Sequence, residues 1–359
     1  MKTLHNDSGT RSRWANASYP GLLLSILACF SCGPELEPIS KIQTLRIVGV
    51  KKSAPYARPG EKVQLSLLWE DGRAVPAAQV ETFIAFWCLN PPSNLYSACL
   101  TTPPPPDFEP QFVFNSNRFE IDIPVDSLQP SIADPRMPDS GIAYVFYGVC
   151  AGTLSGALIE AKVPGDAMGV SGNALMPRCL DATGAEVSPD DFVVGYSSVF
   201  VYDDLRNQNP IVKGFKVAGK EVRVDCIDEE CEKEFDLPQL DKCEKDVACI
   251  EACPDDGSPE LCPDIKIEAL INPASAEKDD LAKVAYGTDL EEAIWVSYFI
   301  DRGKVSPSVK LVNDSALGWQ ADFTTELFAP KEKGPLRIWA AVRDNRGGLS
   351  WVRLPAFVY

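Results

Sequence analysis

Cysteine is the residue type whose spacing carries the most chemical information in this sequence. Half of the 12 cysteines fall in one acidic segment, and these six are Cys226, Cys231, Cys243, Cys249, Cys253 and Cys262. Structural zinc usually takes cysteines two to four apart in two tight pairs, often with histidine. The spacing here fits that pattern poorly. We therefore expect three disulfides that cross-link a segment too acidic to form a core, with all fifteen pairings open.

A second set of four cysteines precedes this segment, namely Cys88, Cys99, Cys150 and Cys179. Pairing neighbours along the chain would close loops of about 12 and 30 residues, each worth roughly 3 to 3.5 kcal/mol in the chain-entropy model. A redox site usually has a Cys-x-x-Cys pair, and no such pair occurs after residue 32. We predict that these four cysteines also form structural disulfides.

Histidine is nearly absent, because the single histidine is His5. Without histidine further along the chain, serine–histidine triads, histidine-ligated zinc and imidazole general bases are excluded there. A pair of carboxylates can hydrolyse glycosidic bonds without histidine. Among 51 acidic residues, however, the sequence singles out no such pair. We predict no catalytic residue and a protein that is not an enzyme.

The acidic residues between the clustered cysteines are weak candidates for a calcium site. Asp228, Glu230, Asp255 and Asp256 offer the hard oxygen ligands that calcium prefers. Their spacing does not match an EF-hand loop, so a solvated acidic face is the favoured interpretation. The Asp344-Asn345 turn is the second place where calcium could bind. We predict no resident metal or cofactor, with calcium as the open alternative.

Two further patterns suggest binding but have simpler explanations. Residues 214 to 220, GFKVAGK, have the glycine spacing of a phosphate loop, but the next residue is Glu221 rather than Ser or Thr, and the flanks predict strands. We predict a hairpin there. The six tryptophans after residue 32 would be a sugar-stacking face if exposed, although most occupy strand positions that suit a core: Trp69, Trp87, Trp295, Trp319, Trp339 and Trp351.

Alternating hydrophobicity predicts that strands carry these residues. Lys62 to Trp69 places valine, leucine and tryptophan on one face and polar residues on the other, with the period of two that a half-buried strand requires. Asp71-Gly72 follows as a hairpin signal. We predict strands at 43–51, 62–69, 80–88, 119–123, 142–150 and 192–202, then at 211–217, 220–225, 265–271, 292–300, 307–312, 319–324, 335–343 and 349–358.

Many short strands with frequent turn signals favour antiparallel sandwiches over βαβ units. The sequence NQNP at 207–210 is a candidate boundary. We predict an all-β chain of two immunoglobulin-like antiparallel β-sandwich domains, at 43–206 and 207–359, the second interrupted by a disulfide-rich acidic insert at 226–262. Residues 334–359 resemble the last hairpin of bacterial immunoglobulin-like or PKD-like modules, with a turn at 344–348. That resemblance implies a fold and not a function.

The N-terminal 32 residues have the features of a secretion signal. Lys2, Arg11 and Arg13 precede an apolar run at 21–31 that is too short to span a bilayer. A signal of this length ending on cysteine resembles the bacterial lipoprotein signal, in which that cysteine is lipidated. Cys29 has the better preceding residues, but lipidation of Cys32 leaves ten cysteines, an even set that can pair completely. We favour Cys32, with 33–42 as a tether.

These observations together predict a non-enzymatic envelope lipoprotein, exported and anchored through its lipid, with a binding or scaffolding role. The residue after the lipidated cysteine would be Gly33, or Phe30 if Cys29 is used. By the lipoprotein resemblance, the absence of aspartate there implies the outer membrane. A net charge of −17 argues against nucleic acid as a partner. The expected partner is an envelope protein or extracellular ligand. The alternatives are a carbohydrate-binding or glycan-active protein and a calcium-dependent adhesion module.

Overall fold

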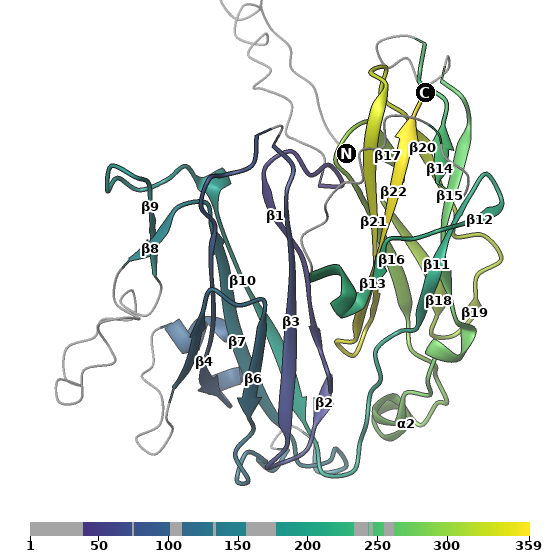
Figure 1. The fold of residues 1–359 in the computed structure, drawn as a ribbon. Coiled ribbons are helices and arrows are strands. Elements are labelled where there is room, and N and C mark those ends of the chain that lie inside the picture. The colour runs from purple at the N-terminus through teal and green to yellow at the C-terminus, as the bar shows by residue number, and fades with distance from the viewer. Residues whose placement is uncertain are drawn as a thin grey trace, which may run out of the picture. The chain divides into compact units, whose positions relative to one another are not determined.

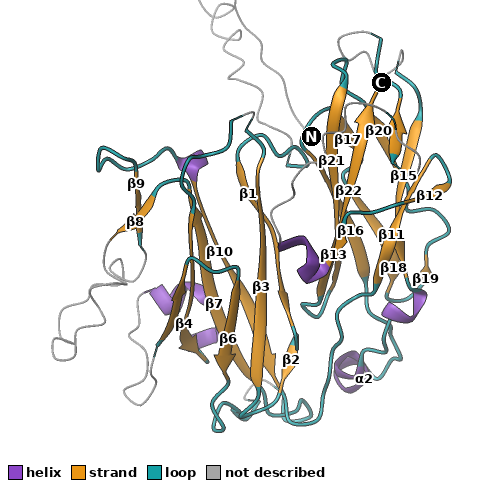
Figure 2. Cartoon of the chain, viewed as in Figure 1, coloured by secondary structure: helices purple, strands orange, loops and turns teal. Residues whose placement is uncertain are grey.

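Strands make up most of the regular structure, and the helices are short (Figure 2). The structure is a computed structural model that describes residues 39–73, 75–100, 110–131, 134–155, 177–232, 243, 247–254 and 262–359. The predicted all-β class is confirmed. Two sandwiches of immunoglobulin-like type, each built from two sheets around its own core, follow one another along the chain (Figure 1).

The first sandwich packs a three-stranded sheet, in the order β1-β3-β6, against a five-stranded sheet, in the order β2-β10-β7-β4-β5. Alternation decides which side chains face inward. Val63 and Leu65 are buried in the shared core, while Lys62 and Gln64 between them are exposed, as the sequence predicts. The strands are β1 (Leu45–Lys52), β2 (Tyr56–Ala57), β3 (Lys62–Asp71), β4 (Glu81–Leu89), β5 (Gln111–Phe114), β6 (Arg118–Asp122), β7 (Gly141–Cys150) and β10 (Phe192–Val201).

The second sandwich packs a five-stranded sheet, β12-β11-β15-β20-β17, against a seven-stranded sheet that contains β22-β21-β16-β18. Tyr298 lies at its centre and accepts a hydrogen bond from the Ala269 N–H, which joins the two sheets. The strands are β11 (Val212–Val217), β12 (Lys220–Val222), β13 (Cys226–Ile227), β14 (Ala248–Ile250), β15 (Ile265–Ile271), β16 (Ile294–Ile300), β17 (Lys304–Ser306), β18 (Val309–Asp314), β19 (Gly318–Trp319), β20 (Thr325–Phe328), β21 (Gly334–Asp344) and β22 (Leu349–Val358). One helix, α2 (Asp280–Tyr286), lies between β15 and β16.

Two disulfides fix elements to the outer face of the first sandwich. Cys88–Cys99 joins β4 to the 3-10 helix η3 (Tyr96–Leu100), and Cys150–Cys179 joins β7 to β9 (Arg178–Leu180). In turn, β9 pairs with β8 (Thr153–Ser155). This local pairing is the one predicted. Trp87 and Phe146 are stacked within the same buried cluster, so the outer face of this sheet carries a second apolar layer.

The acidic insert forms three disulfides and closes the edge of β22. Its pairs are Cys226–Cys231, Cys243–Cys249 and Cys253–Cys262, each between neighbouring cysteines. At that edge, β13 pairs with Val352 and Arg353, and β14 pairs with residues 356 to 358. An unpaired β22 edge would expose a row of backbone donors and acceptors. The insert is therefore part of the seven-stranded sheet of the second sandwich, a role that its sequence did not predict.

Two predicted local structures differ from those observed. Asp71-Gly72 is no hairpin, because β3 pairs with β1 and β6 whereas β4 belongs to the other sheet. A Cβ on Gly72 would lie 1.9 Å from the Ile42 carbonyl oxygen, so glycine is required there for close packing. The predicted strand at 319–324 is wrong, because β19 ends at Trp319 and β20 begins at Thr325. The hairpin predicted in place of a phosphate loop is confirmed by the pairing of Val217 with Lys220.

Residues 39 to 359 form one compact unit in which the two sandwiches share a buried apolar cluster. Val48 and Leu68 of the first sandwich and Trp339 and Trp351 of the second belong to it, together with the Cys226–Cys231 disulfide. The sequence analysis assigned the first residues of this unit to the tether. In the structure they are bonded to β16, because the Ile42 N–H donates to the Ile300 carbonyl oxygen. Among the described residues, no helix is long and apolar enough to cross a membrane.

Candidate functional site

A cleft between the sandwiches is the strongest candidate for a functional site. It encloses about 280 Å³ and lies where β1 and β10 of the first sandwich face the β21–β22 turn of the second. Two cationic side chains, Lys52 and Arg343, line it. The other lining residues are Gly49, Val50, Tyr147, Tyr196, Ser197, Ser198, Asp344, Gly347, Gly348 and Leu349.

Lys52 is the last residue of β1 and is only 3% exposed. Its ammonium group donates a hydrogen bond of 2.8 Å to the Ser198 carbonyl oxygen of β10. Burial disfavours the charged form and lowers the pKa of Lys52 to about 8, although the negative charge of Asp344 opposes this effect. A nearly buried lysine is costly to keep charged. The Ser198 carbonyl and the charge of Asp344 offset only part of this cost.

Arg343 projects from β21 into the same cleft. One of its terminal nitrogens donates to the Val48 carbonyl oxygen at 2.7 Å. Burial lowers the pKa of this guanidinium from its ordinary value. In the part of the chain that the structure describes, neither Arg343 nor Lys52 has a carboxylate oxygen within salt-bridge distance. Both cations are held by neutral carbonyl groups, which leaves donors of the Arg343 guanidinium for a ligand.

The buried arginines of this acidic chain, among the described residues, are paired with carboxylates. Arg346 forms ion pairs with Glu277 and Glu292, and Arg353 forms ion pairs with Asp225 and Glu70. This is the usual arrangement for a buried charge, because an unpaired one is expensive to desolvate. With acidic residues in excess, pairing Lys52 and Arg343 would have been easy. Asp344 acts on Lys52 through its charge, but no carboxylate of the described residues lies within ion-pair distance of either cation, and we take this as the mark of a site that a ligand completes.

The β21–β22 turn that forms one wall of the cleft is fixed by its own sequence. The Asp344 carboxylate accepts hydrogen bonds of 2.8 Å from the N–H groups of Arg346 and Gly348. A Cβ on Gly348 would lie 2.0 Å from Asp344 Oδ2, and Gly347 has φ +94°, so both positions require glycine. Burial raises the pKa of Asp344. The predicted Asp-Asn-Arg-Gly-Gly turn therefore positions the cleft wall.

The connection between the sandwiches holds the two walls together. Asn209 donates to the Lys52 carbonyl oxygen at 2.7 Å, and its own amide oxygen accepts from the Leu349 N–H at 3.0 Å. Asn207 is buried beside Asp344 and accepts from Arg346 at 3.0 Å. The NQNP sequence is therefore more than a boundary signal, since its asparagines fix the position of Lys52 relative to the turn.

Of the candidate sites predicted from sequence, the Asp344-Asn345 turn lies in the cleft wall, where the Asp344 carboxylate accepts from backbone N–H groups, and the others lie elsewhere. Asp228 is bound to Lys51 at 2.8 Å and accepts from the Trp351 N–H, while Glu230 is exposed. Asp255 and Asp256 lie outside the described residues, as do Cys29 and Cys32. Within the described ranges, no three cysteine, aspartate or glutamate side chains come together as a metal site. All ten cysteines predicted to form disulfides do so.

The tryptophans do not form a sugar-stacking face. Trp87, Trp339 and Trp351 are at most 1% exposed. Trp69, Trp295 and Trp319 are half-buried, and Trp69 donates to Asn117 while Trp319 packs on the second core. The core interpretation is the one observed for five of the six tryptophans, the exception being Trp295. The cleft cations were missed because Arg343 occupies a polar position of an alternating strand, which normally indicates solvent exposure. The available signal for the cleft was the pair of consecutive lysines, Lys51 and Lys52, at the end of an apolar strand.

No protein-family model matches this chain, and no curated protein does. Among solved structures it is similar to the chicken CNTN1 FN1-FN3 domains, at 9% identity and a TM-score of 0.17, covering 89% of this chain and 66% of that one. It is also similar to Escherichia coli alpha-2-macroglobulin activated by porcine elastase, at 9% identity and a TM-score of 0.20, covering 89% and 22%. These likenesses carry no functional argument. The chain spans about two thirds of the CNTN1 fragment and about one fifth of the alpha-2-macroglobulin.

Proposed function

We propose that this protein is an exported, non-enzymatic binding protein, anchored to a membrane by a lipid on Cys32, with Cys29 as the alternative. The five disulfides support export, because such bonds persist in oxidising compartments. The anchor, and placement at the outer membrane, rest on the N-terminal sequence. The intact mass of the mature N-terminal peptide tests the anchor, since an unmodified N-terminal residue would exclude it.

The cleft binds an anionic group of the partner. The observation that carries this proposal is the pair of cations, buried Lys52 and half-buried Arg343, which are bonded only to carbonyl groups among the described residues. An anion entering the cleft would complete their charge pairing. Charge-assisted hydrogen bonds of this kind are roughly twice as strong as neutral ones.

Thermal unfolding with simple anions tests the cleft. The chain from residue 33 contains the whole compact unit. At pH 7 and constant ionic strength, replacing chloride with acetate should raise its unfolding temperature by about 2 to 4 °C, as expected for a ligand at about ten times its Kd. The variant Lys52→Met/Arg343→Met should lose this rise. Lys213→Met, at an exposed lysine of β11, is the matched control and should keep it. An equal rise in all three proteins would show a general salt effect and refute the site.

A further inference from the structure

The edge of β10 beside the cleft is open in the sense that no strand is hydrogen-bonded to it between Val194 and Ser198, although β1 lies next to it at the cleft. Its even-numbered residues point their backbone groups away from β7, as the bond from the Phe200 N–H to the Pro55 carbonyl shows. Beyond that point β2 covers Phe200 and Val201. Within the described part of the chain, the N–H groups of Val194, Tyr196 and Ser198 have no acceptor. The edge therefore presents a row of three free donors that leads to the cleft.

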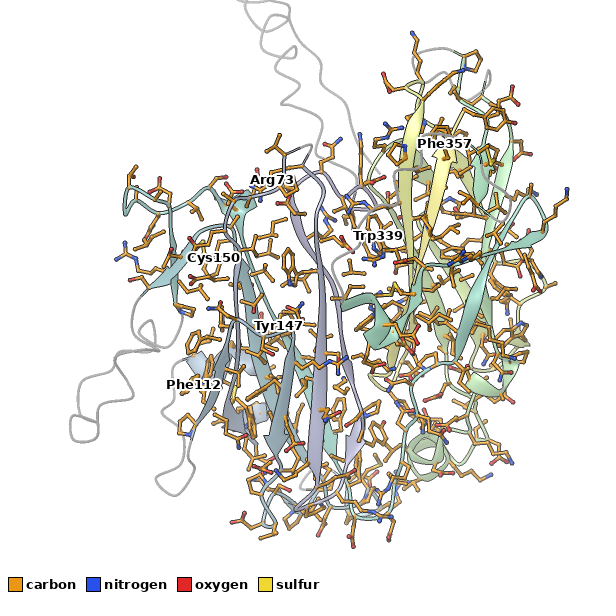
Figure 3. The ribbon with its side chains drawn as sticks, in the orientation of Figure 1. Arg73, Phe112, Tyr147, Cys150, Trp339 and Phe357 are labelled. Atoms are coloured by element: carbon orange, nitrogen blue, oxygen red, sulfur yellow. A yellow bond between two sulfur atoms is a disulfide. The ribbon has the colours of Figure 1, made fainter. Side chains whose placement is uncertain are left out.

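Two of the three carbonyl acceptors on the same edge are already bonded. The Tyr147 hydroxyl donates to the Tyr196 carbonyl at 3.0 Å, and Lys52 donates to the Ser198 carbonyl. Tyr147 of β7 (labelled in Figure 3) reaches this edge by passing over Gly195, its pairing partner on β10. A Cβ on residue 195 would lie 2.7 Å from the Tyr147 ring, so glycine leaves room for the tyrosine. An edge with three free donors and most of its acceptors bonded favours a ligand that supplies acceptors, such as the carbonyl and carboxylate oxygens at the end of a peptide.

The open edge stops at the cleft. Past Ser198, β2 occupies the edge and runs parallel to β10, while Gly347 to Leu349 form the opposite wall. A ligand strand therefore has about four residues, or roughly 13 Å, along Val194 to Ser198 before it meets Lys52 and Arg343. Charge decides its direction. A strand parallel to β10 would bring a terminal carboxylate to the two cations, whereas the opposite direction would bring an ammonium group.

An exposed apolar surface lies beside the free donors. Val194 is 46% exposed and Tyr196 is 43% exposed. Tyr96 of η3 stacks on Tyr196, with ring centroids 4.0 Å apart. Residues 194 and 196 lie two apart on one face of the strand, so this surface fits alternate side chains of an added strand.

We propose that the open edge of β10 binds the C-terminal residues of another polypeptide, with its terminal carboxylate between Lys52 and Arg343. This deepens the proposed anion-binding function and rests on it. The ligand runs parallel to β10. Its carbonyl oxygens accept from Val194, Tyr196 and Ser198, and an apolar side chain packs on the Tyr96–Tyr196 pair.

Calorimetry with three synthetic hexapeptides of one apolar, threonine-rich sequence tests the proposal. The first has a free carboxyl end, the second an amidated end, and the third an amidated end with one internal glutamate. The free acid should bind at least tenfold more tightly than either amide. Equal binding by the simple amide would overturn the role of the carboxylate. Equal binding by the glutamate peptide would show that an internal acidic side chain is the ligand, which overturns the C-terminal assignment.

Two further measurements separate this inference from the anion site itself. Val194→Pro removes one edge N–H that does not bond β7. This variant should bind the free-acid peptide about fivefold or more weakly than the wild type does. The acetate-induced rise in unfolding temperature should be unchanged. An unchanged peptide affinity would refute the edge, and the lack of an acetate response in the wild type would refute the proposed function. Hydrogen exchange in the wild type needs no variant. Peptide should slow exchange of the Val194, Tyr196 and Ser198 amides at least tenfold, and unchanged rates would refute the edge.

Discussion

The interface between the two sandwiches contains buried and half-buried cations in two different arrangements. In the Glu70 cluster, Glu70 of β3 accepts from Trp339 at 3.0 Å and from Arg353 at 3.1 Å, and Arg337 lies 3.4 Å from its second oxygen. Arg353 also forms an ion pair with Asp225, and Arg337 forms one with Asp301. In the cleft, Lys52 and Arg343 are bonded to carbonyl groups alone among the described residues.

The difference separates charges that hold the fold together from charges that are available to a ligand. A buried ion pair with complete hydrogen bonding tolerates no loss of a partner, because the remaining charge is then uncompensated. A buried cation held by carbonyl groups already bears part of that cost. Removing it should relieve the fold and abolish binding. The two arrangements therefore predict stability changes of opposite sign.

The largest effect is expected in the Glu70 cluster. Glu70→Ala leaves the Trp339 indole without its acceptor and removes one carboxylate from two arginines. We expect a loss of about 3 to 5 kcal/mol in the free energy of unfolding, measured by urea denaturation. Glu120→Ala is the control, because its ion pair with Lys62 is solvent-exposed and should contribute less than about 1 kcal/mol. Equal losses would show that the cluster is no more than a surface contact.

The insert disulfides offer the next test of the interface. The Cys226–Cys231 bridge is buried between the sandwiches, whereas Cys243 and Cys249 are exposed. Both bridges close short loops, for which chain entropy gives about 2 kcal/mol each. We expect Cys226→Ala/Cys231→Ala to lose about 3 to 4 kcal/mol because apolar contacts are lost as well, and Cys243→Ala/Cys249→Ala about 2 kcal/mol. Thermal unfolding of both variants measures these losses of stability. Equal losses in the two variants would contradict the role of the Cys226–Cys231 bridge in the interface.

The opposite sign is expected for Lys52. Its folded-state pKa of about 8 lies below the ordinary 10.5, so folding favours the neutral amine. The wild type should therefore gain stability as pH rises from 8 to 10.5. At pH 7, Lys52→Met should be more stable than the wild type by about 1 to 3 kcal/mol, and this advantage should shrink by pH 10. Urea titrations at both pH values measure it. A variant less stable than the wild type at pH 7 would place Lys52 with the structural charges.

The smallest effect concerns anion affinity and pH. Because Lys52 loses its proton above about pH 8, acetate should bind about tenfold more weakly at pH 9.5 than at pH 7. Lys52→Arg keeps its charge over this range and should show little change. Calorimetric titration at both pH values provides the comparison. A wild-type affinity that does not depend on pH would exclude Lys52 from the anion contact.

The sequence predicted the features that depend on local pattern. Alternation located strands such as 62–69, and the lack of a redox motif predicted that Cys88, Cys99, Cys150 and Cys179 form structural disulfides, which pair locally as Cys88–Cys99 and Cys150–Cys179. Both depend on residues that are close along the chain or on a period of two. The same reasoning failed at Asp71-Gly72, where the hairpin signal is real but Gly72 packs against Ile42, and this contact comes from outside the local segment.

The cleft was not predictable in the same way. Lys52 and Arg343 come from strands almost three hundred residues apart, and polar positions of an alternating strand usually face water. Here each of the two residues faces the other sandwich, and Asn209 fixes the approach through its bonds to Lys52 and Leu349. No local pattern encodes a contact between two domains. Histidine content, by contrast, is a property of the sequence alone, and it excludes histidine-dependent chemistry from every residue after His5.

The most direct test is the free energy of unfolding of the wild type and of Lys52→Met/Arg343→Met, each measured with urea at pH 7 in chloride and in acetate at equal ionic strength. If the cleft cations are available to a ligand, the double variant is at least as stable as the wild type in chloride, and acetate stabilises the wild type alone. A double variant that is clearly less stable in chloride, together with the same acetate effect on both proteins, would contradict this and make Lys52 and Arg343 part of the structural interface.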